Sequence, residues 1–344
     1  MMKENKNVTI GGASIAPNSR KQVHIKLPRL YDYTEMTIPV KVMRGKKEGP
    51  RLFVSAAIHG DEINGVEVIK RLLHHPDLKS TQDICGTLVL VPIVNVFGYN
   101  NKSRYLPDRR DLNRCFPGHY QGPLASQLAY TFMEEIVKKC THGIDLHTGA
   151  VRRTNIPQIR ACLDQGETQE LAQAFNAPVI INAQLRDGSL REAARELNIP
   201  MLLFEGGEAL RFDDYAIDTA LRGILNVMRE IGMIKTTHEK EEGTKPIFIA
   251  RTSHWVRAPQ SGSLQSFVKV GDTVKKKQIL GVISDPFGYH ATRVESPLNG
   301  MIIGATTLPL INTGDASFHI ATFEDLKEHE QFNDQRYGPI SKVT

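Results

Sequence analysis

Short apolar strands alternating with amphipathic helical segments constrain the fold of this 344-residue chain more than any other feature. Apolar runs at residues 51–57, 86–95, 143–147 and 201–205 are predicted to be buried strands, with weaker strands at 159–163 and 178–182. Helical spacing follows at 64–73, 124–139, 189–197 and from Asp213 or Asp214 to about Ile231. This pattern predicts an α/β fold with a mixed central sheet flanked by helices.

The character of the sequence changes near residue 246. Residues 235–246 are polar and charged and end in a proline, which is typical of a linker. Beyond them, short apolar stretches are punctuated by glycine and proline, which predicts an all-β segment. We therefore expect two domains, a catalytic-type α/β domain at 1–240 and a smaller β-rich, barrel-like domain at 246–344.

Polar residues that can bind a metal follow three of the predicted strands. His59 and Glu62 stand three residues apart where a strand turns into a helix, so both can face one ion. His147 and Glu205 end two further strands. Because open α/β sheets gather their sites at the carboxyl ends of strands, we expect these side chains to meet. Asp145 alternates with residue 146 and so shares the face of His147, as a candidate supporting partner.

These residue types point to metal-assisted hydrolysis. Two imidazoles and one carboxylate can bind zinc and leave a coordination position open. A second carboxylate nearby, Glu205, can handle the protons of a water molecule. Taken singly, each signal also fits a surface histidine, a hydrogen-bonded core histidine or an exposed acid at a strand end.

The segment 104–118 carries four arginines within fifteen residues. Arginine binds carboxylates in a bidentate manner and can polarise a carbonyl that is being cleaved. The alternative interpretation of this segment is a solvated basic loop.

Four motifs occur in order along the chain: His59-Gly-Asp-Glu62, Asp111-Leu-Asn-Arg-Cys-Phe-Pro-Gly118, Asp145-Leu-His147 and Phe204-Glu205. Together they resemble the succinylglutamate desuccinylase/aspartoacylase family, which belongs to the wider zinc carboxypeptidase-like superfamily. The resemblance covers roughly residues 20–235 and, more loosely, the C-terminal part.

The resemblance implies that His59, Glu62 and His147 bind one Zn²⁺ per chain and that Glu205 activates a water molecule as general base. It also implies that Asn113 and Arg114 bind a substrate carboxylate. An arginine beside the scissile carbonyl is expected too. Arg104 matches the family's Arg-Tyr pair, but extra residues before Asp111 make Arg109 a competing candidate.

The implied activity is hydrolytic deacylation of an N-acylated amino acid or a similar small anionic amide. The alternatives are a zinc carboxypeptidase acting on peptides and a non-catalytic metal-binding regulator. The acyl group, the amine and the oligomeric state, including a homo-oligomer, stay open.

Residues 258–262 and 268–281 look like half of a biotinyl/lipoyl-type barrel, with a second half beginning at Ser296. The hairpin at 284–289 contains no lysine, so we expect no biotin or lipoate. The segment is expected instead to shape the mouth of the active site or to mediate oligomerisation.

The overall composition bears on nucleic-acid binding, membrane insertion and cellular location. A formal net charge of +5, spread along the chain, indicates a solvated surface rather than nucleic-acid binding. The four cysteines form no CxxC pair, and the N-terminus has no apolar signal region. No run of 18 apolar residues exists, so no membrane span is expected. We therefore expect a cytoplasmic protein.

Overall fold

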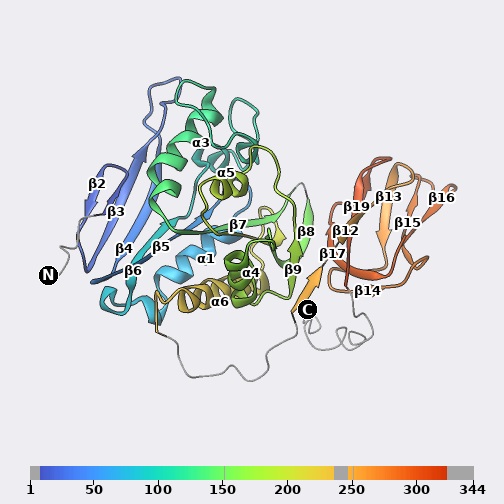
Figure 1. Cartoon of the computed structure of the whole chain (residues 1–344). Helices are drawn as coiled ribbons and strands as arrows, with labels where there is room; N and C mark the ends of the chain where they lie inside the picture. The colour runs from blue at the N-terminus through green and yellow to red at the C-terminus, as the bar shows by residue number, and fades with distance from the viewer. Residues whose placement is uncertain (1–7, 151, 236–246, 251, 324–344) are drawn as a thin grey trace, which may run out of the picture.

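The computed structural model describes residues 8–150, 152–235, 247–250 and 252–323. A 13-stranded mixed sheet runs through it (Figure 1). Its main path, from one edge to the other, is β12 (Thr252–Arg257), β19 (Ala316–Thr322), β17 (Gly300–Thr306), β8 (Arg153–Ala161), β10 (Met201–Glu208), β7 (His142–Gly149), β5 (Lys47–Ala56), β6 (Cys85–Val91), β4 (Thr37–Arg44) and β3 (Ser19–Lys26). Three more strands attach to this path: β9 (Val179–Asn182), β11 (Phe248–Ala250) and β14 (Thr273–Val274).

The centre of the sheet is parallel and its flanks are antiparallel. Strands β10, β7, β5 and β6 pair in parallel, whereas β8 pairs with β10, and β4 with β6 and β3, in antiparallel fashion. A separate two-stranded hairpin, β1 (Val8–Ile10) and β2 (Ala13–Ile15), lies beside β3. The parallel centre aligns the carboxyl ends of β5, β7 and β10 along one edge.

Helices cover both faces of the sheet (Figure 1). On one face α1 (Asn64–Leu73), α4 (Gly166–Phe175) and α6 (Asp214–Glu230) share an apolar core with the central strands. On the other face α3 (Leu124–Glu135) and α5 (Leu190–Glu196) form a second core. Shorter elements are α2 (Val96–Asn100), η1 (Pro76–Leu78), η2 (Thr81–Asp83), η3 (Leu112–Arg114) and η4 (Val137–Lys139). The predicted fold class, a mixed α/β sheet flanked by helices, is confirmed.

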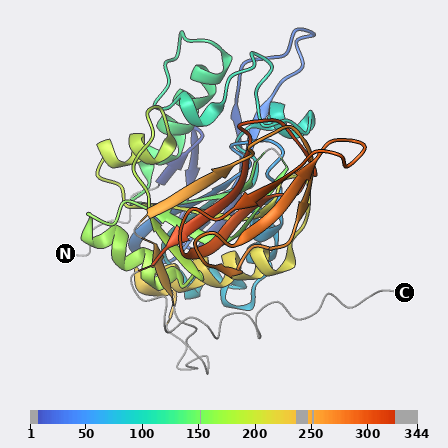
Figure 2. The same cartoon turned by 90° about the vertical axis from the view of Figure 1, so that its right-hand side faces the viewer.

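The C-terminal strands build a second layer. A four-stranded antiparallel sheet contains β16 (Ala291–Glu295), β15 (Ile279–Ser284), β13 (Gly262–Ser266) and β18 (Leu310–Ile311). It encloses a core with side chains of β12, β14, β17 and β19, as the rotated view shows (Figure 2). The confirmed fold therefore includes the smaller all-β part that the sequence predicts.

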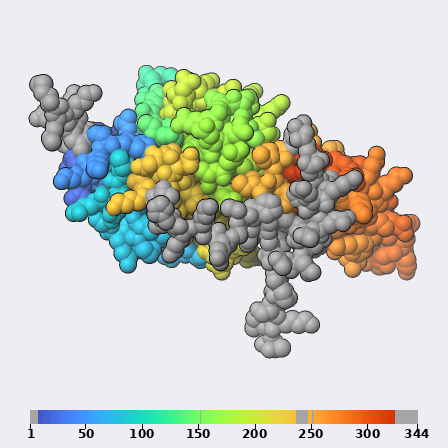
Figure 3. Space-filling view, turned by 60° about the horizontal axis from the view of Figure 1, so that its bottom comes forward, coloured from blue at the N-terminus to red at the C-terminus, as the bar shows by residue number. Residues whose placement is uncertain are grey.

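This β-rich part also joins the central sheet directly. Gly304, Ala305 and Thr306 of β17 pair with Asn155, Thr154 and Arg153 of β8. The space-filling view shows the C-terminal part, in orange and red, packed against the green segment of the chain (Figure 3). Residues 236–246 hold the expected boundary and nearly all of the expected linker at 235–246. They fall outside the described residues, so the division into two domains stays a prediction.

None of the helices in the described part of the chain combines the length and apolar character that a membrane crossing requires.

Candidate functional site

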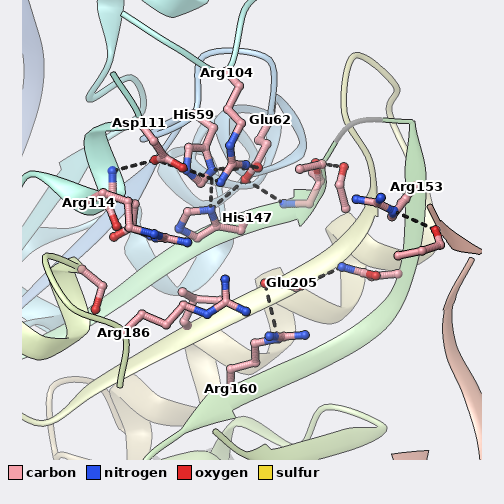
Figure 4. A pocket seen from close by; sticks show the side chains of 18 of the residues that line it. His59, Glu62, Arg104, Asp111, Arg114, His147, Arg153, Arg160, Arg186 and Glu205 are labelled. Carbon is pink, nitrogen blue, oxygen red and sulfur yellow. Dashed lines mark hydrogen bonds and ion pairs between the residues drawn. The ribbon is translucent and has the colours of Figure 1, made fainter. Parts of the chain in front are cut away.

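His59, Glu62 and His147 meet at the carboxyl edge of the parallel strands (Figure 4). Their candidate ligand atoms all lie within 4.8 Å of one another. The Nδ1 atoms of His59 and His147 lie 2.8 and 2.7 Å from the two oxygens of Glu62. All three residues are buried. The structure thus brings together the three residues that the sequence proposes as metal ligands.

The far side of each imidazole is held by an aspartate. His59 Nε2 lies 3.0 Å from Asp111 Oδ1, and His147 Nε2 lies 2.6 Å from Asp145 Oδ2. Because a carboxylate only accepts hydrogen bonds, each Nε2 can donate to its aspartate, and each Nδ1, which faces Glu62, would bind a metal once it has given up its proton. Ser55 in turn donates to Asp145 at 2.8 Å. The predicted shared face of Asp145 and His147 is confirmed, whereas the contact of Asp111 with His59 was not foreseen.

The charges of the cluster support one another. Burial alone would raise the pKa of Glu62, but His59 and His147 outweigh it and hold the pKa of that carboxyl well below its usual value. Burial likewise opposes the charged form of His147, yet Asp145 and Glu62 raise its pKa. Glu62 is therefore an ionised carboxylate, the form that binds metals.

The residues present fit a zinc ion. Two imidazole nitrogens and one carboxylate converge, and a supporting carboxylate fixes the tautomer of each histidine. This is the donor set and the second layer of hydrogen bonds that three-ligand zinc sites use.

Of the two competing arginines, Arg104 lies beside the cluster. Its Nη1 is 3.1 Å from Glu62 Oε1, and its Nη2 donates to Asp111 Oδ2 at 2.9 Å. Arg109 is exposed, with a φ of 62°, and does not line the cavity around the cluster.

Asn113 and Arg114 line the same cavity. The side-chain oxygen of Asn113 accepts a hydrogen bond from the Leu190 backbone at the start of α5, at 2.9 Å. Arg114 Nη1 donates to the Asn113 carbonyl at 2.6 Å. Both side chains are thus fixed in place with donors left over for a ligand.

A bulge directs Glu205 toward the cavity. The register of β10 shifts after Glu205 on both of its neighbours. Gly207 has a φ of +73°, and a Cβ there would lie 2.5 Å from Asn64 Nδ2. Asn64 Nδ2 donates to the Gly206 carbonyl at 3.1 Å and so ties the bulge to α1. Only glycine meets both demands at residue 207, and such bulges commonly redirect a side chain beside a site.

Three side chains of β8 hold the Glu205 carboxylate. Asn155 Nδ2 donates to Oε2 at 2.6 Å, and Gln158 Nε2 donates to the same oxygen at 3.4 Å. Arg160 Nε lies 3.4 Å from Oε1 as an ion pair without hydrogen-bond alignment. Asn155, Gln158 and Arg160 were not identified from the sequence. Their polar side chains in an otherwise buried strand could have indicated a role, because buried polar groups need hydrogen-bond partners.

The cavity of about 630 Å³ is strongly basic. Its lining includes three acidic residues, Glu62, Asp111 and Glu205, and seven arginines at positions 104, 114, 153, 160, 186, 191 and 257. Figure 4 shows Arg114, Arg160 and Arg186 gathered around Glu205 and the two histidines. Burial, followed by the nearby Arg160, lowers the pKa of Arg191 to about 10. Such an excess of positive charge favours an anionic ligand.

The C-terminal strands form part of the cavity wall. Trp255, Arg257 and Ala316 line the cavity. Arg153 of β8 donates through Nε to the Ala316 carbonyl at 3.3 Å, and its guanidinium lies 5.3 Å from the centre of the Trp255 ring. The Trp255 ring also stacks on His319, with the ring centres 4.2 Å apart.

The buried His319 is expected to make the folded protein less stable in acid. Burial, aided by Arg160, His254 and Arg186, lowers the pKa of His319 to about 3 from the usual 6.5 of a histidine. Between pH 6.5 and 3 the unfolded chain therefore binds a proton that the folded protein excludes, and stability falls as pH falls, by about 1.4 kcal/mol per pH unit. Replacing His319 with Phe keeps an aromatic ring against Trp255 but cannot titrate.

Urea unfolding at pH 7 and pH 5 tests this expectation. The native protein should lose about 2 kcal/mol more than His319→Phe over that interval. Equal losses in the two proteins would assign the acid sensitivity to other groups.

Fold and site together define an α/β protein with a buried His–Glu–His cluster that could hold a metal ion at the carboxyl edge of its sheet. The model of the succinylglutamate desuccinylase/aspartoacylase catalytic domain matches residues 48–231, more than half of the chain. The chain therefore belongs to this family, and the resemblance seen in its motifs is confirmed.

Individual relatives cover nearly the whole chain. It is 27% identical over 318 residues to the N-alpha-acetyl-L-2,4-diaminobutyric acid deacetylase of Halomonas elongata, across 86% of this chain and 90% of the relative. Its fold is similar to the product-bound ectoine utilization protein EutE (DoeB) of Ruegeria pomeroyi, with a TM-score of 0.80 and 23% identity over 89% of this chain and 96% of that one. A succinylglutamate desuccinylase/aspartoacylase of Rhodobacter sphaeroides gives a TM-score of 0.80 and 22% identity, with the same two coverages.

Proposed function

We propose that this protein is a zinc-dependent deacylase that hydrolyses the amide bond of an N-acylated amino acid or a similar small anionic amide. The observation that carries the proposal is the convergence of His59 and His147 on Glu62 in a basic cavity that also holds Glu205. Membership of the desuccinylase/aspartoacylase family and the deacetylase activity named for the Halomonas elongata relative support it.

His59, Glu62 and His147 would hold the zinc ion, which when bound supplies a Lewis acid for the acyl carbonyl and lowers the pKa of water. Glu205 accepts a proton from the water that attacks the carbonyl carbon and returns it to the departing amine nitrogen. The C–N bond breaks, and a carboxylate and a free amine leave.

The surrounding arginines orient and stabilise the substrate. Arg104 donates to the carbonyl oxygen as negative charge develops there. Asn113 and Arg114 bind the carboxylate of the amino acid and fix its position relative to Glu205. The seven arginines of the cavity favour a substrate with a net negative charge.

A panel of N-acyl amino acids tests the proposed function. Zinc-loaded protein is incubated with N-acetyl and N-succinyl amino acids, among them N-acetyl-L-2,4-diaminobutyrate and N-succinyl-L-glutamate, and amine release is measured. We expect turnover of at least one member and little cleavage of longer peptides. Cleavage of peptides alone would favour a carboxypeptidase, and full zinc occupancy without any amine release would favour a non-catalytic regulator.

Arg104→Ala and Arg109→Ala form a matched pair within one loop. The first should lower kcat about 10²-fold because it removes a donor from the developing oxyanion. The second should stay within about two-fold, because Arg109 is exposed and does not line the cavity. Zinc content is measured alongside, since Arg104 also contacts Glu62. A larger loss from Arg109→Ala would reverse the assignment of the two arginines.

A further inference from the structure

The shortest hydrogen bond to Glu205 comes from a side chain of β8 that has a C-terminal strand, β17, as one of its two neighbours. Asn155 Nδ2 lies 2.6 Å from Glu205 Oε2, and Asn155 is 8% exposed. The other two partners, Gln158 and Arg160, are each at 3.4 Å. Because a carboxylate only accepts, the amide nitrogen of Asn155 faces Glu205 and its oxygen faces away.

The oxygen of Asn155 faces Gly304. Gly304 of β17 is the direct partner of Asn155 in the ladder between β17 and β8. A Cβ at residue 304 would lie 2.6 Å from Asn155 Oδ1, while the next atoms, on His319 and Thr154, are at 3.4 Å. Real Cβ atoms do not approach that closely, so any side chain at 304 would displace the Asn155 amide. Gly304 therefore permits the position in which Asn155 reaches Glu205.

We propose that Asn155 is a positioning residue that aligns the Glu205 carboxylate for proton transfer, and that Gly304 of the C-terminal strands sets that alignment. This inference rests on the proposed function, in which Glu205 moves the proton. A general base must lie within hydrogen-bond reach of the proton that it takes, and small displacements cost large factors in rate. The C-terminal strands thereby govern turnover as well as the shape of the cavity.

A double-mutant cycle tests the proposal. Gly304→Ala, Asn155→Ala and the double variant are compared with the native protein on the panel compound that shows the highest turnover. We expect each single variant to lower kcat about ten-fold, with KM and zinc content within about two-fold of native. In the Asn155→Ala background, Gly304→Ala should change kcat by less than about two-fold, because the amide that it displaces is gone.

Gly281→Ala is the matched control for damage to the C-terminal strands. Its Cβ would lie 2.6 Å from the Gln265 carbonyl oxygen, the same close approach as at residue 304, but Gly281 does not line the cavity. It should lower Tm while leaving kcat near the native value. An equal loss of kcat from Gly304→Ala in both backgrounds, or a similar loss from Gly281→Ala, would overturn the positioning role.

A crystal structure of Gly304→Ala provides a readout that is independent of turnover. The distance from Asn155 Nδ2 to Glu205 Oε2 should exceed 3.5 Å, and an unchanged contact would overturn the inference. The proposed function fails separately, if Glu205→Gln retains native kcat in the same assay or if no panel compound releases an amine.

Discussion

A Glu205→Gln variant is expected to lose about 10²-fold or more of kcat on N-acyl amino acids while retaining one zinc per chain. Glutamine matches glutamate in size but cannot take up the proton of the attacking water, and general acid–base catalysis contributes about 10²- to 10⁴-fold. The metal content should persist because Glu205 is not among the three residues whose ligand atoms converge. Steady-state kinetics and elemental analysis on the same preparation give both quantities.

Glu208→Gln is the control for this experiment. Glu208 lies three residues further along β10, accepts a hydrogen bond from Thr307 at 2.9 Å and does not line the cavity. Its kcat should stay within about two-fold of native. Residual activity above about a tenth of native in Glu205→Gln would remove Glu205 from proton transfer, since the expected loss is at least a hundred-fold.

A His147→Ala variant is expected to lose stoichiometric zinc and, with it, measurable turnover. The change removes one of three ligand residues and takes from Glu62 a contact at 2.7 Å. It also leaves Asp145, which is fully buried, without the imidazole that it contacts at 2.6 Å. An unpaired buried carboxylate destabilises a protein by roughly 3–5 kcal/mol, so Tm should fall as well.

His142→Ala separates these effects from those of any histidine change in β7. His142 contacts Thr141 and Glu167 at the opposite end of the strand. Its variant should keep zinc and kcat close to native. Full zinc occupancy in His147→Ala would show that the metal is held elsewhere.

The convergence of His59, Glu62 and His147 was predictable because it follows from local rules. His59 and Glu62 are joined by helical spacing, and Asp145 and His147 by strand alternation. The parallel order of β5, β7 and β10 then brings their ends to one edge. Each step needs only the period of one element or the common direction of neighbouring strands.

The surroundings of Glu205 were not predictable in this way. Asn155, Gln158 and Arg160 reach it because β8 runs antiparallel beside β10, a pairing that no local period encodes. The sequence suggested a strand only at 159–163, whereas β8 spans Arg153–Ala161. Which arginine, Arg104 or Arg109, lies beside the cluster depends on the path of an irregular loop. The register between β17 and β8 is likewise not set by the periodicity of either strand.

The ladder between β17 and β8 also bears on how long the protein stays active when heated. The part of β8 that carries Asn155 is an interior strand only while β17 is hydrogen-bonded to it. If the C-terminal strands detach, that stretch becomes an exposed edge and Asn155 loses its neighbour Gly304, even where the His–Glu–His cluster stays folded. We therefore expect that reinforcing the contact between β17 and β8 would prolong the half-life of activity at high temperature.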